Sequence, residues 1–185
     1  MISLWIFADV PIDSDGALER VLRPLAHERD SHGRPFVPGH PELRLSMSHA
    51  EGMLLVAVAD GCRVGVDVEI VRDRGISSLP AHALSERELN DLGEPPGLET
   101  FLSYWTRKEA VLKAAGVGLA IEPSLVELAR NGPNVCRLPA AFGPPDRWSA
   151  CEVPLDGYAA AFAADVPSPV LSVHRASAWG FVCVS

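Results

Sequence analysis

Two carboxylates stand two positions apart in the segment GVDVE at residues 65–69, as Asp67 and Glu69. If this segment is a strand, its side chains alternate between faces, so both acids share one face and Val66 and Val68 share the other. Adjacent carboxylates repel each other unless a cation lies between them, and Mg²⁺ prefers oxygen ligands. Taken alone, the motif favours acids on a solvated strand face, with a metal site as the alternative.

A second set of reactive side chains recurs every four residues in FLSYWTRKEAVLKAAG, at Trp105, Glu109 and Lys113. This spacing places them on one face of a helix. Glu109 and Lys113 could form a surface ion pair, which would contribute only about 0.3–0.5 kcal/mol. Trp105 on the same face instead indicates partial burial, and buried charges need partners such as a metal ion with a phosphate. Lys108 lies on another face, where we expect it to reach a phosphate or solvent.

Two shorter motifs precede these. Ser48 and His49 close a predicted strand in SMSHA, just before a turn at residues 51–52. A histidine at a strand end is more often structural or exposed than functional. Arg34 lies in the turn GRP at residues 33–35, where it could be no more than a surface charge.

The elements that must position these residues follow from hydrophobic periodicity and turn residues. One helix is expected to begin at Ser85, which forms a capping box with Glu88, and to stop at Gly93. A longer helix should end at Gly116, a typical C-cap. The predicted strands cover residues 3–9, 43–49, 53–60 and 63–71 and segments near 124–130, 148–153, 158–164 and 170–174, and the predicted helices cover 15–29, 85–92 and 98–115.

One internal similarity indicates how the chain is organised. EGMLLVAVAD at 51–60 and DGYAAAFAAD at 156–165 align without gaps, each with an acid, a glycine, an apolar run and Ala-Asp. Ten apolar-rich residues can match by chance, so the signal is weak on its own. If it is real, it predicts two similar lobes that each contribute a strand of the same kind.

Composition narrows the function classes. A chain of 185 residues with 48% hydrophobic content can bury a sizeable core. The net charge of −8 argues against binding to nucleic acid, and no apolar run approaches the roughly 20 residues needed to span a membrane. The four cysteines form no C-x-x-C pair, so we expect reduced thiols and a cytoplasmic location.

The motifs GRPF, LSMSHAEG, GVDVE and WTRKEAVLKAAGVGL occur in this order between residues 33 and 119. Together they resemble the 4′-phosphopantetheinyl transferase superfamily, and more narrowly its pseudo-dimeric class that serves polyketide and nonribosomal peptide synthetases. The resemblance implies an α+β fold of two similar α/β lobes, each a small, mostly antiparallel sheet with a packed helix. The active site would lie in the cleft between the lobes. We expect an N-terminal lobe at 1–62 and a C-terminal lobe at 63–185, which form one folding unit.

The resemblance also implies an activity. Members transfer 4′-phosphopantetheine from coenzyme A, their co-substrate, to a serine of an acyl- or peptidyl-carrier protein, with Mg²⁺ bound and 3′,5′-ADP released. Carried over residue by residue, it implies that Asp67, Glu69 and Glu109 bind Mg²⁺, Glu69 directly or through water. Glu109 and Lys113 would be catalytic, Glu109 by taking the proton of the carrier serine and Lys113 by contacting the phosphate of coenzyme A. Arg34, Ser48, His49, Lys108 and Lys113 would hold the nucleotide.

The chain departs from the family pattern in its first lobe, which is shortened. Family members of this class usually carry several tens more residues there, with a basic stretch for the 3′-phosphate and adenine. Only Arg20, Arg23 and Arg29 are available here, which predicts a loose hold on coenzyme A. The alternative is a non-catalytic relative that binds a carrier protein or a nucleotide, but retention of all three acids argues against it. Carrier docking is expected to use apolar contacts through residues such as Ile76 and Leu79.

Overall fold

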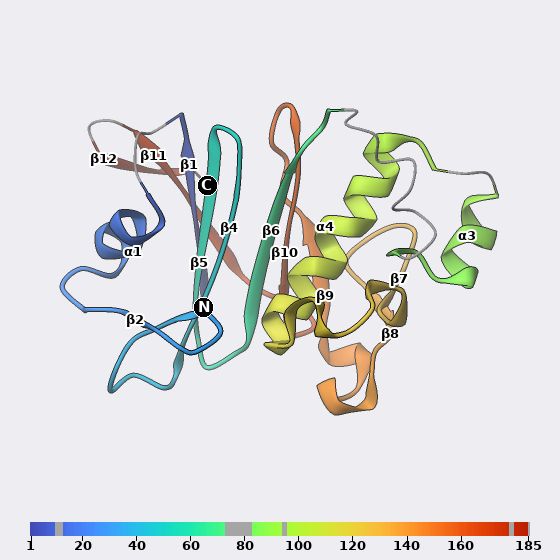
Figure 1. The fold of residues 1–185 in the computed structure, drawn as a ribbon, viewed down its shortest axis with the longest axis horizontal. Helices are drawn as coiled ribbons and strands as arrows, with labels where there is room; N and C mark the ends of the chain where they lie inside the picture. The colour runs from blue at the N-terminus through green and yellow to red at the C-terminus, as the bar shows by residue number, and fades with distance from the viewer. Residues whose placement is uncertain (10–12, 73–82, 94–95, 178–179, 185) are drawn as a thin grey trace.

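The computed structural model describes residues 1–9, 13–72, 83–93, 96–177 and 180–184. Figure 1 shows their main architecture as a helix, two sheets and a second helix arranged side by side. The main helices are α1 (Ser14–Leu22), α3 (Glu86–Leu92) and α4 (Leu98–Ala115). The strands are β1 (Ile2–Ala8), β2 (Glu28–Arg29), β3 (Pro35–Phe36), β4 (Leu43–Ala50), β5 (Met53–Asp60), β6 (Val64–Ile70), β7 (Glu127–Leu128), β8 (Val135–Arg137), β9 (Ser149–Glu152), β10 (Tyr158–Ala164), β11 (Leu171–Ser177) and β12 (Gly180–Val184).

The first sheet has the strand order β12-β11-β1-β5-β4. β1 pairs in parallel with β11 and antiparallel with β5, and β4 and β5 form an antiparallel hairpin. Helix α1 covers one face of this sheet, where Leu18 and Leu22 pack with Phe7 and Val56. The alternation of inward and outward residues along β4 agrees with the predicted half-buried strand.

Helix α1 is shorter than the predicted helix over residues 15–29. It begins after Asp13, whose carboxylate accepts a hydrogen bond from the Gly16 amide, and it ends at Leu22. Pro24 explains this end, because a residue that precedes proline is disfavoured in helical geometry, and Arg23 is accordingly extended. Residues 28 and 29 instead form β2, which pairs with β3.

The second sheet has the order β6-β10-β9, and α4 covers one of its faces. Along β6, Val66 and Val68 point away from α4 into a core shared with the first sheet, which includes Leu4 and Leu55. Asp67 and Glu69 therefore lie on the face towards α4, as the alternation predicted. The predicted first and last residues of the long helix α4 are confirmed, and so is the capping box of α3. Both helices end at a glycine with left-handed geometry, α3 at Gly93 and α4 at Gly116.

The two segments that resemble each other in sequence occupy corresponding positions. β5 contains the first and lies between β1 and β4, whereas β10 contains the second and lies between β6 and β9. Each of these two strands forms a hairpin with the strand before it and pairs antiparallel with an earlier strand. The last strands, β11 and β12, return to the first sheet although they belong to the 63–185 segment.

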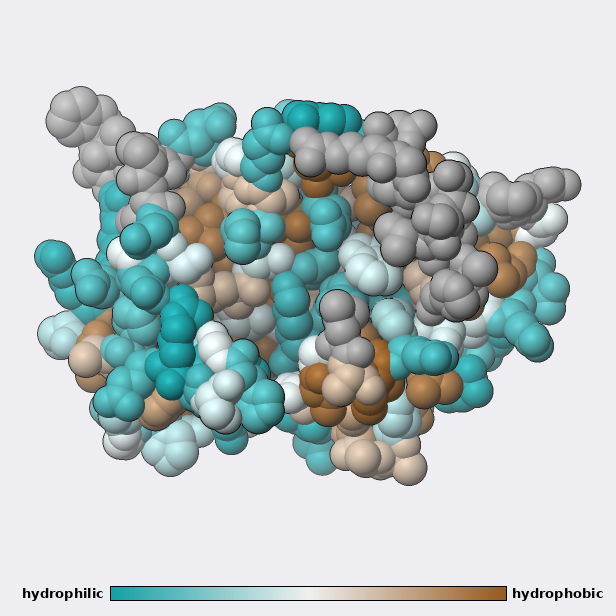
Figure 2. Space-filling view, viewed as in Figure 1, coloured by the Kyte–Doolittle hydropathy of each residue, from teal (hydrophilic) through white to brown (hydrophobic). Residues whose placement is uncertain are grey.

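Among the residues that the structure describes, no helix is long and apolar enough to cross a membrane. On the face drawn in Figure 2, hydrophobic side chains appear mainly as small patches among hydrophilic ones.

Candidate active site

The site forms where α4 packs directly on the backbone of β6. A Cβ atom on Gly65 would lie 2.0 Å from the carbonyl oxygen of Ala110, so only glycine permits this contact. Ala161 and Ala163 on the neighbouring strand β10 pair with Asp67 and Gly65, and both are fully buried small residues beneath α4. The close approach places the face of α4 that carries Glu109 and Lys113 against the carboxylate face of β6.

Asp67 is the centre of the polar contacts. Its Oδ1 atom accepts hydrogen bonds from the Lys113 ammonium at 2.7 Å and from the Ser48 hydroxyl at 2.8 Å. The Ser48 Oγ atom in turn accepts from Lys113 Nζ at 3.0 Å and from the Val68 amide at 3.3 Å. One residue from each of β4, β6 and α4 therefore meets at a single point.

Two carboxylates lie beside this triad. Burial, the charge of Asp67 and the charge of Glu69 raise the pKa of Glu109 to about 7, although Lys113 opposes the shift. Burial and the charge of Asp67 also raise the pKa of Glu69, whose carboxylate accepts a hydrogen bond from Trp105. The helix face that carries Trp105, Glu109 and Lys113 is partly or fully buried. Glu109 and Lys113 therefore do not form a solvent-exposed surface ion pair.

The residues fit a cation, although no group of three His, Cys, Asp or Glu side chains in the described ranges is arranged to enclose one. Asp67 Oδ2 and Glu109 Oε1 are both buried and have no hydrogen-bond partner in the part of the chain that the structure describes. Buried carboxylate oxygens without a partner are costly, and hard divalent cations prefer such oxygens. Asp67, Glu69 and Glu109 are therefore the side chains that could hold Mg²⁺.

A basic cavity of about 400 Å³ adjoins the site and is lined by Lys113, Arg34, His49, Arg29 and His32 among others. Arg34 lies at its floor, where its guanidinium donates to the Gly116 carbonyl at 2.7 Å and to Asp30 at 2.8 Å. Arg29, one of the three arginines available in place of the family's basic stretch, lines this cavity. Arg20 and Arg23 are not among the lining residues.

Ser46 was missed by the sequence interpretation. Its Oγ atom accepts a hydrogen bond from the Val66 amide at 3.0 Å, two residues before the equivalent contact of Ser48. The spacing of the two serines in LSMS puts them on one face of β4. That spacing could have identified Ser46 as a neighbour of Ser48 on the same face. The role of the two hydroxyls as hydrogen-bond acceptors, however, depends on β6 lying alongside β4.

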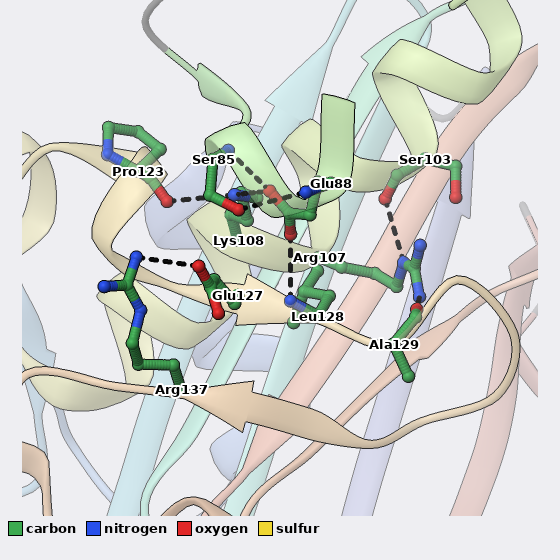
Figure 3. Close-up of polar contacts among 10 residues, drawn as sticks. All are labelled: Ser85, Glu88, Ser103, Arg107, Lys108, Pro123, Glu127, Leu128, Ala129 and Arg137. Atoms are coloured by element: carbon green, nitrogen blue, oxygen red, sulfur yellow. Dashed lines mark hydrogen bonds and ion pairs between the residues drawn. The ribbon is translucent and has the colours of Figure 1, made fainter. Parts of the chain in front are cut away.

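Lys108 is not brought to the site. Its side chain is fully buried, and Nζ contacts Glu88 at 2.6 Å and the Pro123 carbonyl at 3.2 Å (Figure 3). Glu88 also accepts from the Ser85 and Leu128 amides, so every oxygen of the pair has a partner. The expectation that Lys108 reaches a phosphate or solvent is wrong, because the neighbouring α3 covers this face of α4.

The expected carrier contacts Ile76 and Leu79 lie outside the described residues. Cys62, Cys136 and Cys151 are free thiols.

The chain is similar to known proteins over much of its length. The sequence profile of the 4′-phosphopantetheinyl transferase superfamily matches residues 63–163, more than half of the chain. Over 118 residues the chain is 29% identical to a 4′-phosphopantetheinyl transferase of Bacillus subtilis, covering 61% of this chain and 52% of that protein. Over 142 residues it is 32% identical to the 4′-phosphopantetheinyl transferase HetI of Nostoc sp. (strain PCC 7120), covering 72% and 58%. It is 31% identical over 108 residues to AcpT of Salmonella typhimurium, a 4′-phosphopantetheinyl transferase, covering 54% of each.

The chain spans about half the length of the curated relatives that it matches. The matched region includes β6 and α4, which carry Asp67, Glu69, Glu109 and Lys113. The chain therefore belongs to the 4′-phosphopantetheinyl transferase superfamily.

Proposed function

We propose that this protein transfers 4′-phosphopantetheine from coenzyme A to a serine of an acyl- or peptidyl-carrier protein. The observation that carries the proposal is the contact of Lys113 with Asp67 and Ser48 at the edge of the basic cavity. Nearby Glu109 supplies a buried carboxylate with a pKa of about 7. A catalytic base and a phosphate-binding cation are thus held on one helix face, next to a space that can take an anionic nucleotide.

The bond changes assign a role to each group. The serine Oγ attacks the phosphorus that carries the pantetheine arm, and the bond from that phosphorus to the bridging oxygen breaks. 3′,5′-ADP leaves with the bridging oxygen and its electron pair. Glu109, directly or through a water, takes the serine proton, since its carboxylate lies on the same face of α4 as Lys113. Lys113 donates to the phosphoryl oxygens, where negative charge increases as the bond breaks.

Mg²⁺ would be held by Asp67, Glu69 and Glu109 and would neutralise negative charge on the pyrophosphate when bound. The unpartnered buried oxygens of Asp67 and Glu109 support this assignment. A bound cation would also offset the repulsion that the charges of Asp67 and Glu69 exert on Glu109, which contributes to the raised pKa of Glu109.

The nucleotide of coenzyme A would enter the cavity that Arg29, Arg34 and His49 line. Arg34 is already anchored by Asp30 and Gly116, so it is pre-positioned. We further propose that the two sheets are the cores of two similar lobes with the site at their junction. The corresponding pairing of β5 and β10 with their neighbouring strands supports this. A cytoplasmic location is part of the same proposal and agrees with the three free thiols.

Mass spectrometry of apo-carrier domains incubated with the protein, coenzyme A and Mg²⁺ tests the activity. We expect the mass of one phosphopantetheine group to be added on the carrier serine. Asp67→Asn and Glu109→Gln should abolish this, whereas Glu122→Gln, at an exposed acid away from the site, should not. Binding of coenzyme A without any added mass, over a panel of carriers, would favour the non-catalytic alternative.

A further inference from the structure

The geometry points to a second role for Lys113: its ammonium is the resident counter-ion of Asp67 and must be displaced when a divalent cation binds there. In this arrangement the lysine competes with the metal for the same carboxylate. The inference rests on the proposed function only for the identity of the ligand, and it concerns binding and not transfer.

The contacts define the competition. Asp67 is 5% exposed, so its charge is removed from water and needs a cation close by. The Lys113 ammonium supplies one at 2.7 Å from Oδ1, and the Ser48 hydroxyl fills the other approach to that oxygen at 2.8 Å. Only Oδ2 is left without a partner. A metal that used both oxygens, or that approached Oδ1, would meet the ammonium.

Charge gives the same answer. Glu69 and Glu109 share the site with Asp67, and burial together with the charge of Asp67 raises the pKa of both carboxyls. Lys113 opposes both shifts, so it is the protein's own compensation for this clustered negative charge. A divalent cation bound to the same carboxylate as the ammonium would lie close to it, and the two cations would repel each other.

The Lys113 side chain has room to move away from Asp67. Its side chain is 29% exposed and lines the basic cavity, whereas Asp67 is enclosed. A lysine ammonium sits on a flexible four-carbon stem and can exchange partners without a change in the backbone. We therefore expect Asp67 to stay in place and Lys113 to turn towards the cavity, where an anion would receive it.

Titration of metal-free protein with Mn²⁺, followed by electron paramagnetic resonance of the free ion, tests this without coenzyme A or a carrier. Lys113→Met should bind Mn²⁺ at least tenfold more tightly than the wild type, because its side chain retains length but loses charge. Arg44→Met is the matched control: Arg44 is exposed, lines an adjacent cavity together with Lys113, and has no ion pair among the described residues. It should change the affinity less than threefold.

Thermal unfolding gives a second readout. Lys113→Met in the presence of a chelator should melt below the wild type, because Asp67 loses its counter-ion, and Mn²⁺ should restore more of the melting temperature than it adds to the wild type. Lys113→Gln provides a second, polar variant if the first does not fold.

Several outcomes would overturn the inference: unchanged or weaker Mn²⁺ affinity in both lysine variants, an equal gain in Arg44→Met, or no Mn²⁺ binding to any form. Carrier modification is assayed separately. Tighter Mn²⁺ binding by the lysine variants, together with no transfer by the wild-type protein, would overturn the proposed function and leave this inference standing.

Discussion

The Ser48 hydroxyl lies 2.8 Å from the Asp67 carboxylate, although the two residues belong to different sheets and stand 19 positions apart. Ser48 therefore links the strand that lines the basic cavity to the strand that carries the acids. The same oxygen accepts hydrogen bonds from the Val68 amide and the Lys113 ammonium, so its loss affects three groups at once.

Ser48→Ala should lower the free energy of unfolding by about 1–3 kcal/mol, since it leaves the buried Val68 amide without its acceptor. Urea denaturation measures this. Ser46→Ala removes the equivalent acceptor for Val66 and should cost a similar amount. Only Ser48→Ala should also lower kcat, because Ser46 does not touch Asp67 or Lys113. Equal kcat values in the two variants would show that Ser48 acts only in folding.

Gly65→Ala should be among the most damaging single-methyl additions to this protein. Its Cβ would meet the backbone of α4, which cannot give way like a side chain, so we expect a loss of about 1–3 kcal/mol or more. The helix would move away from β6 and weaken Mn²⁺ binding. Gly97→Ala, at a position with open space around it, is the control and should bind Mn²⁺ normally. Normal metal binding in Gly65→Ala would contradict the tight packing described for β6 and α4.

Lys108→Ala should destabilise the fold by about 3–5 kcal/mol, because it leaves the Glu88 carboxylate buried without its counter-ion. Thermal and chemical denaturation test this. The double variant Lys108→Met with Glu88→Leu removes both charges and should recover much of the loss. In the fraction that stays folded, KM for coenzyme A should not change. A large rise in KM in the stable double variant would show that Lys108 does take part in nucleotide binding.

The stability of the metal-free protein should fall as the pH rises from 5 to 8. The raised pKa of Glu109 means that the folded state keeps a proton that the unfolded state has already lost, so unfolding becomes easier with rising pH. A shift from 4.5 to about 7 corresponds to roughly 3 kcal/mol across the whole window. Glu109→Gln should flatten this dependence and exceed the wild type in stability at pH 8. Glu122→Gln, at an exposed acid, should leave the slope as it is; an equal slope in Glu109→Gln would place the effect elsewhere.

Much of the local structure could be predicted because its signals are local. Helix α4 begins and ends at the predicted residues, since Gly116 adopts the left-handed geometry that stops it. The alternation in GVDVE correctly assigned Asp67 and Glu69 to the face opposite Val66 and Val68. The spacing of Trp105, Glu109 and Lys113 correctly gave one helix face, because helical periodicity does not depend on the rest of the chain.

The parts that could not be predicted depend on distant packing. Lys108 follows the same helical periodicity as its neighbours, but only the position of α3 decides that it is buried against Glu88. Likewise, the return of β11 to pair with β1 joins residues about as far apart as the chain allows. No local sequence pattern predicts that β11 pairs with β1. The early end of α1 at Leu22 was a missed local signal, because Pro24 was present in the sequence.

The contact between β4 and β6 has a consequence for aggregation. Each is an edge strand of its own sheet, and open edges with free amides attract strands from other molecules. Here the amides of Val66 and Val68 donate hydrogen bonds to the hydroxyls of Ser46 and Ser48. Each sheet therefore covers the open edge of the other, although the two edges do not form a backbone hydrogen-bond ladder. Either half expressed alone would present an open strand edge and its side of the apolar core that the two sheets share, and we expect it to assemble into insoluble material, not to fold as a separate unit.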